Sequence, residues 1–132
     1  MADPDILVVE DDADIMWSLT QRLSAAGYHT IPAPDGDSAL AVSQQNHLDA
    51  AIVDINLPMK NGFEVAEQLL AQGIKTILIT ASRDQAYRQK AKRLGCHGFV
   101  EKPFTRPYLL SLLADLLEGD DAAKDVAPKE AS

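Results

Sequence analysis

The sequence is poor in cysteine, in aromatic residues and in long hydrophobic runs. Its single cysteine, Cys96, cannot form a disulfide within the chain, which is typical of a reducing compartment. Hydrophobic residues make up 46% of the chain, but no run of them is long enough to predict a transmembrane helix. The first five residues contain two acids and no base, unlike a signal peptide. We therefore expect a cytoplasmic protein without membrane association, in which Cys96 is a buried structural thiol.

Basic residues are also scarce. The 12 Lys and Arg are outnumbered by 20 Asp and Glu, which gives a formal net charge of −8. Because binding to nucleic-acid phosphates requires clustered Lys and Arg, this composition argues against direct nucleic-acid binding by this chain. Residues 118–132 carry −3 of the net charge and contain few large apolar side chains. We predict one domain over residues 1–118, followed at 119–132 by an acidic disordered tail or an interdomain linker.

Short apolar runs alternate with helical patterns five times along the chain. The runs are typical of buried strands, at residues 6–9, 28–32, 50–54, 75–79 and 98–101. The helical patterns, with their capping residues, span residues 12–27, 37–45, 62–73, 84–94 and 105–117. This alternation predicts an α/β fold with a parallel sheet covered on both faces. For five strands, the flavodoxin-like (βα)5 arrangement with strand order 2-1-3-4-5 is the common solution.

Reactive side chains stand at the ends of four predicted strands. Glu10 and Asp11 follow the first strand, and Asp54 ends the third. Thr80 follows the fourth strand and Lys102 the fifth. A parallel sheet brings these ends to one edge, where three crowded carboxylates require a compensating cation. Oxygen ligands with a high negative charge favour a hard divalent ion, so we predict Mg²⁺.

With a divalent ion in place, Asp54 is a carboxylate nucleophile aimed at phosphorus. The Lys102 ammonium and the Thr80 hydroxyl then lie where a transferred phosphoryl group gains negative charge, and phosphoryl transfer needs little beyond such positioning. Taken singly, each of these residues also has an ordinary explanation as a helix cap, a turn or a surface charge. Their occurrence together on the required strand ends favours a phosphoryl-transfer site.

From Asp5 to about Leu117 the sequence resembles the receiver domain of two-component response regulators, most closely those of the stand-alone chemotaxis type. Four motifs carry this resemblance, at residues 7–12 (LVVEDD), 54–62 (DINLPMKNG), 79–81 (ITA) and 102–104 (KPF). The resemblance implies that Asp54 is the phosphoacceptor, which takes phosphate from a histidine kinase or a phosphotransfer protein. It also implies that the Lys102–Pro103 peptide bond is cis.

The resemblance further implies that Mg²⁺ is held by Glu10, Asp11, Asp54 and the backbone carbonyl of Asn56. Many family members have Asp at the position of Glu10, and Glu10 keeps the same negative charge. Asp12 is a third acid in this run, and we assign it to helix capping rather than to the metal.

The family also has a conformational switch, in which the Thr80 hydroxyl moves toward the phosphoryl group and Phe99 turns to fill the space. The moving face is then the fourth helix, the fifth strand and the fifth helix, and it signals to a downstream protein partner. The fourth helix is mostly polar, as expected for an element of low local stability. Asn56 and Ser82 flank the route of water to the acyl phosphate in this family, so we predict that they set its lifetime.

Several alternatives share these residues. Phosphatases of the haloacid dehalogenase type also use an Asp nucleophile, but they carry a second acid where this chain has Asn56, so we expect no turnover enzyme. The chain could instead be a pseudo-receiver that binds partners without phosphorylation. It could also be the receiver part of a larger DNA-binding regulator or of a hybrid kinase. The leucines of the last helix leave open whether the protein is a monomer or a weak dimer.

Overall fold

The computed structural model describes residues 3–118, so the predicted tail at 119–132 lies outside the described residues. Five strands and five helices alternate along this part of the chain. The strands are β1 (Asp5–Val9), β2 (His29–Ala33), β3 (Ala50–Asp54), β4 (Lys75–Thr80) and β5 (Gly98–Glu101). The helices are α1 (Ala13–Ala25), α2 (Gly36–Gln45), α3 (Gly62–Ala71), α4 (Gln85–Leu94) and α5 (Arg106–Leu117).

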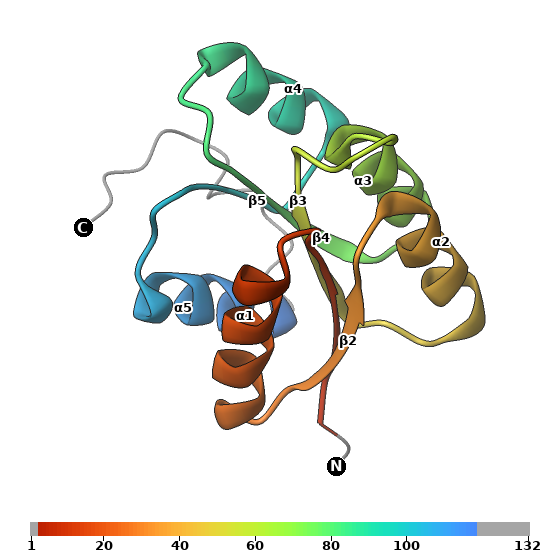
Figure 1. Ribbon diagram of the computed structural model, residues 1–132, viewed down its shortest axis with the longest axis vertical. Coiled ribbons are helices and arrows are strands. Elements are labelled where there is room, and N and C mark those ends of the chain that lie inside the picture. Colours follow the sequence, from red (N-terminus) through yellow and green to blue (C-terminus); the bar gives the residue numbers. More distant parts are fainter. Residues whose placement is uncertain (1–2, 119–132) are drawn as a thin grey trace.

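The strands form one parallel sheet in the order β2-β1-β3-β4-β5, which confirms the predicted flavodoxin-like fold. Figure 1 shows α1 and α5 on one face of this sheet and α2, α3 and α4 on the other. Since all strands run the same way, their carboxyl ends lie along a single edge, and the loops that follow them meet there.

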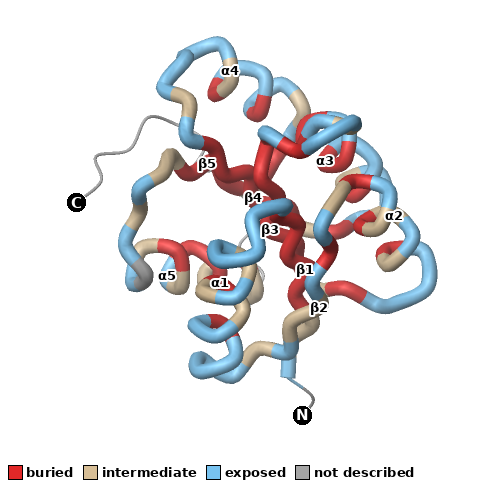
Figure 2. The backbone as a smooth tube through the Cα atoms, viewed as in Figure 1, coloured by how far each residue is buried: buried red, intermediate tan, exposed pale blue. Residues whose placement is uncertain are grey.

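The core has two layers, one on each face of the sheet, and successive strand residues alternate between them. Leu7 and Val9 of β1 pack with α2, α3 and α4, whereas Ile6 and Val8 pack with α1 and α5. Figure 2 shows that β1, β3, β4 and β5 are buried along nearly their whole length, while the edge strand β2 is only partly buried and the outer surfaces of the helices are exposed. Strands covered on both faces explain the continuous apolar runs in the sequence.

Polar capping residues fix the beginnings of the helices. Asp12, Asn61 and Thr105 each accept a hydrogen bond from a backbone N–H of the first turn of α1, α3 and α5. The predicted capping roles of Asp12 and Thr105 are therefore confirmed. In α3 the Glu64 side chain also accepts from the Asn61 N–H, which completes a capping box.

Several predicted boundaries differ from the structure by one or two residues, and two of the differences have a clear local cause. β2 begins at His29 rather than Tyr28, because the Tyr28 N–H donates to the Leu23 carbonyl and closes the turn that ends α1. Gly27 permits that turn by adopting a φ of 98°. α2 begins at Gly36 rather than Asp37, because Asp35 is its N-cap.

α4 is attached to the sheet by few apolar side chains. Its buried residues are Ala91 and Arg88, and Tyr87 and Leu94 are partly buried against the core. The Arg88 guanidinium lies 4.7 Å from the centre of the Phe99 ring and 3.4 Å from a Glu101 carboxylate oxygen, so an aromatic face and a charge make its burial possible. Cys96, just beyond this helix, is fully buried as predicted. Among the described residues, no helix is long and apolar enough to cross a membrane.

Candidate functional site

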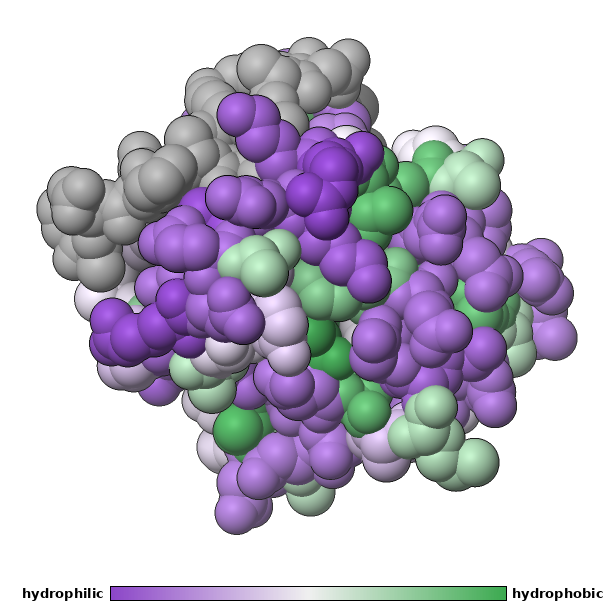
Figure 3. Space-filling model, turned by 90° about the horizontal axis from the view of Figure 1, so that it is seen from above, coloured by the Kyte–Doolittle hydropathy of each residue, from purple (hydrophilic) through white to green (hydrophobic). Residues whose placement is uncertain are grey.

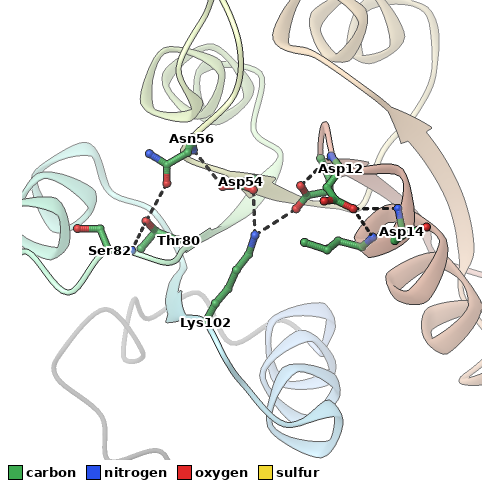
Figure 4. A network of polar contacts seen from close by, with 9 residues as sticks. Asp12, Asp14, Asp54, Asn56, Thr80, Ser82 and Lys102 are labelled. Carbon is green, nitrogen blue, oxygen red and sulfur yellow. Dashed lines mark hydrogen bonds and ion pairs between the residues drawn. The ribbon is translucent and has the colours of Figure 1, made fainter.

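The carboxyl edge of the sheet brings the predicted site residues together from four strands. Glu10 follows β1, Asp54 ends β3, Thr80 ends β4 and Lys102 follows β5. The backbone N–H of Lys102 donates to the backbone carbonyl oxygen of Thr80 at 2.7 Å. This bond holds the chain after β5 against the end of β4. Figure 4 shows the Lys102 side chain extending from the end of β5 toward Asp54.

Lys102 is shared between two buried carboxylates. Its Nζ lies 3.0 Å from Asp54 Oδ2 and 3.4 Å from Glu10 Oε1. Glu10 and Asp54 are only 2% and 4% exposed, so little water reaches either charge. The other Asp54 oxygen, Oδ1, accepts a hydrogen bond from the Asn56 backbone N–H at 3.0 Å. Asp54 is thus held in one orientation by a cation and a backbone donor.

Burial and the crowding of charge shift the pKa values of Glu10 and Lys102. Burial, with a further contribution from neighbouring Asp54, raises the pKa of Glu10 to about 7, although the Asp12 N–H and Lys102 act in the opposite direction. Burial alone would lower the pKa of Lys102, but its hydrogen bonds and charge interactions with Asp54 and Glu10 outweigh burial and raise it. The lysine is therefore cationic at neutral pH, and one positive charge faces more than one carboxyl group.

Asp11 completes a group of acids suited to a metal ion. Oxygen atoms of Glu10, Asp11 and Asp54 all lie within 4.8 Å of one another. Asp11 is exposed, so the group is open to solvent on one side while the other two acids are buried. Three carboxylates with access to water fit Mg²⁺, which prefers oxygen ligands and keeps part of its hydration shell. Asp12 is turned away to cap α1, where it accepts from the Asp14 and Ile15 N–H groups at 2.9 and 3.0 Å.

Thr80, Asn56 and Ser82 form a second group beside the acids (Figure 4). The Thr80 hydroxyl donates to Asn56 Oδ1 at 3.2 Å and accepts from the Ser82 N–H at 3.0 Å. The Ser82 hydroxyl oxygen accepts from the Asp84 N–H at 3.1 Å, at the start of α4. The two residues predicted to govern the acyl phosphate lifetime therefore both contact the predicted switch residue.

Phe99 lies apart from the acids, in the core layer beneath α4. It is 1% exposed and packs in the same layer as Leu78 of β4 and Ala91 of α4. The Arg88 guanidinium covers one face of its ring. The predicted switch aromatic is thus buried in this structure, under the helix expected to move.

The structural roles of two residues near the site were not predicted from the sequence. Gly62 was placed at the end of the 54–62 motif and at the start of a helix, but a Cβ there would overlap the Asp54 carbonyl oxygen and lie 2.6 Å from Ile55 Cα. The Gly62 N–H also donates to the Ile55 carbonyl at 2.8 Å, so α3 begins in contact with the strand that carries Asp54. Arg88 is the second such residue. The one feature of the sequence that could have predicted its burial is its spacing of three residues from Ala91 on the same helix.

A parallel five-stranded α/β domain with an acidic pocket and a lysine at its carboxyl edge is the architecture of receiver domains. The model of the response regulator receiver domain matches residues 6–114. The chain therefore belongs to the receiver domain family of two-component response regulators.

Individual relatives agree with this assignment. The chain is 35% identical over 113 residues to the probable transcriptional regulator ycf27 of Cyanophora paradoxa, which covers 85% of this chain and 47% of that protein. It is 34% identical over 127 residues to the response regulator MprA of Mycobacterium leprae, which covers 92% of this chain and 56% of the relative. The chain thus spans about half the length of the curated relatives it matches.

Solved structures match the domain over almost their whole length. The chemotaxis response regulator CheY4 of Vibrio cholerae is 29% identical with a TM-score of 0.80, over 87% of this chain and 99% of that structure. A CheY-like receiver domain protein of Methanospirillum hungatei is 27% identical with a TM-score of 0.85, over 91% of this chain and 98% of that structure.

Proposed function

We propose that the domain is a phosphoacceptor, which takes a phosphoryl group onto Asp54 from the phosphohistidine of a histidine kinase or phosphotransfer protein. An Asp54 oxygen forms a bond to phosphorus as the phosphorus–nitrogen bond breaks and the imidazole leaves. The observation that carries this proposal is the position of Lys102 Nζ, 3.0 Å from Asp54 Oδ2, beside a group of three acids.

The residues around Asp54 divide the work of this reaction. Lys102 is positioned to neutralise charge on the transferred group, and the Asn56 N–H orients the nucleophile. Glu10, Asp11 and Asp54, with the Asn56 backbone carbonyl, would hold Mg²⁺, which supplies a Lewis acid for the phosphoryl oxygens. Among described side chains at the site, Lys102 is the cation that contacts these acids, and it leaves them with excess negative charge in the absence of a metal ion.

Phosphorylation then changes the position of Thr80. Its hydroxyl is held by Asn56 and Ser82, so reaching the phosphoryl group requires it to exchange the 3.2 Å bond to Asn56 for one to a phosphoryl oxygen. Because Ser82 leads directly into the N-cap of α4, this movement is transmitted to α4 and to the α4–β5–α5 face, where a downstream protein partner binds. The phosphoryl group can only shift an equilibrium that the protein already has.

The domain is not expected to turn over phosphoesters. Asn56 occupies the place where aspartate-nucleophile phosphatases need a general acid, and its amide oxygen is engaged by the Thr80 hydroxyl. Incubation with 4-nitrophenyl phosphate and Mg²⁺ should release nitrophenol no faster than the acyl phosphate on Asp54 hydrolyses on its own. Release many times faster than that hydrolysis would contradict this expectation.

The test of the main proposal is intact mass after incubation with acetyl phosphate, with and without Mg²⁺. Wild type should gain one phosphoryl group only when Mg²⁺ is present, and Asp54→Asn should gain none. Asp12→Asn is the matched control, because Asn keeps the helix cap while removing one nearby charge, and it should be phosphorylated like wild type. A folded wild-type protein that gains no mass would support a non-phosphorylated binding module instead.

The half-length match to transcriptional regulators favours a second candidate, in which this receiver is joined to an output domain in a longer protein. The mass of the protein in its source cells distinguishes a receiver that acts alone from one that is joined to an output domain. An antibody against the domain should detect a 14.3 kDa protein if the receiver acts alone, and a species of roughly twice that mass if an output domain follows.

A further inference from the structure

A hollow of about 740 Å³ opens between the β3–α3 segment and α4. On one side it is lined by Asn56, Pro58 and Asn61, and on the other by Tyr87, Lys90 and Arg93. Tyr87, Lys90 and Arg93 are spaced three residues apart and so share one side of α4, which is turned toward α3. None of its lining residues comes from β5 or α5, so the hollow differs from the α4–β5–α5 face, and Tyr87, Lys90 and Arg93 have no assigned role in phosphoryl transfer.

The wall formed by α4 is unusually basic for this protein. Residues 83–93 contain five of the chain's 12 Lys and Arg and a single acid, Asp84, although the formal net charge of the chain is −8. Lys90 and Arg93 are both exposed, and within residues 3–118 neither has a carboxylate at ion-pair distance. Two cations without a described counter-charge therefore face the same hollow.

Lys90 is held in place by aromatic packing. Its Nζ lies 4.7 Å from the centre of the Phe63 ring, and Phe63 meets Tyr87 edge to face with the ring centres 5.5 Å apart. A lysine in the last turn of a helix can be explained by the helix dipole, but Lys90 precedes the last turn, and its ammonium is directed over the hollow's aromatic floor. Because the Lys90 side chain is already ordered, less side-chain entropy is lost when a ligand binds its ammonium.

The remaining lining is suited to a polypeptide. Phe63 and Leu57 contribute to the floor, and Pro58 and the fully exposed Met59 lie at its outer loop. Figure 3, viewed onto the side where α4 lies, shows hydrophobic surface exposed between hydrophilic ridges. At its other end the hollow reaches Asp11 and therefore the acidic pocket. A long polyanion such as a nucleic acid, or an anionic membrane, would be repelled there, whereas a short acidic segment can end before it.

We propose that this hollow is a docking site for a short acidic segment of a partner protein, whose carboxylates pair with Lys90 and Arg93 and whose apolar side chain lies against the Phe63–Tyr87 floor. Charge complementarity selects the partner, since an overall acidic domain presents its positive surface here. The contact residues are already in place without a phosphoryl group on Asp54, so binding does not require phosphorylation.

The test is a chemical-shift titration of the unphosphorylated ¹⁵N-labelled protein with an acetylated peptide of sequence Glu-Glu-Leu-Glu-Glu. The peptide should shift the amide signals of residues around Asn61 and Lys90, and the same peptide with Gln in place of Glu should bind at least tenfold more weakly. Lys90→Glu/Arg93→Glu should also weaken binding at least tenfold. The neutral pair Lys90→Gln/Arg93→Gln provides the same test if charge reversal disturbs folding.

The matched control is Arg22→Glu/Lys92→Glu, which changes the net charge by the same amount at two exposed residues that do not line the hollow. It should bind within threefold of wild type. Equal weakening by both pairs, or no shift at millimolar peptide, would overturn the proposal. So would a DNA duplex or a phosphatidylserine vesicle that binds through Lys90 and Arg93 when the peptide does not.

Discussion

Helices α3 and α4 cover the same face of the sheet, but they are attached to it in different ways. α3 buries Phe63, Val65, Ala66 and Leu69 in one continuous apolar side, and its first residue contacts the strand that carries Asp54. α4 buries a single small apolar residue, Ala91, together with Arg88. Apolar area is the main source of stability, so α3 should be a rigid support for the site and α4 the part that can move at low cost.

The largest expected effect follows from truncating the attachment of α3. Leu69 is completely buried, so Leu69→Ala should lower the free energy of unfolding by about 3 kcal/mol, through lost transfer energy and a residual cavity. Urea denaturation measures this change. Gln68→Ala, at an exposed position of the same helix, is the control and should have almost no effect. A loss below about 1 kcal/mol for Leu69→Ala would mean that α3 is not the rigid partner.

The contact between α3 and β3 predicts a smaller loss of stability with a larger loss of function. Gly62→Ala should cost about 2 kcal/mol by overpacking, because the new methyl group would overlap the Asp54 carbonyl oxygen. Moving that backbone displaces Asp54 from Lys102, so phosphorylation by acetyl phosphate should slow by more than tenfold in protein that is still folded.

Gly27→Ala separates these two effects. Gly27 favours glycine for a different reason, its φ of 98°, and a Cβ there would meet nothing within 4 Å. Gly27→Ala should lower the free energy of unfolding by about 1 kcal/mol through backbone strain alone, and it should keep the wild-type phosphorylation rate. If both variants slow phosphorylation equally, the contact at Gly62 has no special role.

Arg88 tests the attachment of α4. Arg88→Ala removes packing against Phe99 and the ion pair with Glu101, which is partly exposed, so we expect a loss of about 1 kcal/mol. Arg93→Ala, at an exposed position of the same helix, should have little effect on stability and serves as the control. A cost for Arg88→Ala as large as that of Leu69→Ala would show that both helices are held equally firmly.

The same contrast explains what could be predicted from the sequence. The strands and the helix caps could be predicted because hydrophobic periodicity and capping residues are local signals. The position of Glu10, Asp54 and Lys102 at one edge could be predicted because parallel strands always bring their carboxyl ends together. The position of Arg88 does not follow in this way, because its burial depends on an aromatic ring and a carboxylate supplied by a distant strand. The crowding at Gly62 is equally non-local, since helical sequence signals describe a residue's own element and not the backbone it approaches.

Cys96 reports the opening of α4 directly. It follows α4, is fully buried and donates its backbone N–H to the Ala91 carbonyl. At pH 8 a thiol reagent should react with it only in molecules where this region has opened. Arg88→Ala should therefore speed alkylation about fivefold, the factor that corresponds to roughly 1 kcal/mol, while Leu69→Ala should speed it less than its global destabilisation predicts. Mass spectrometry follows the reaction, and a larger acceleration by Leu69→Ala would mean that the thiol is reached only through global unfolding.

The smallest expected effect is the dependence of stability on pH at the same residue. Burial raises the pKa of Cys96 to about 12 from its ordinary value of 9, so above pH 9 the folded state holds a proton that the unfolded state releases. The stability that this thiol contributes is complete below pH 9 and declines as the pH rises toward 12. Other groups also titrate in this range, so the quantity to measure is the difference in slope between wild type and Cys96→Ala from pH 8 to 10.5. Wild type should lose stability more steeply, and parallel slopes would show that the thiol is accessible to water and that the region after α4 is already open.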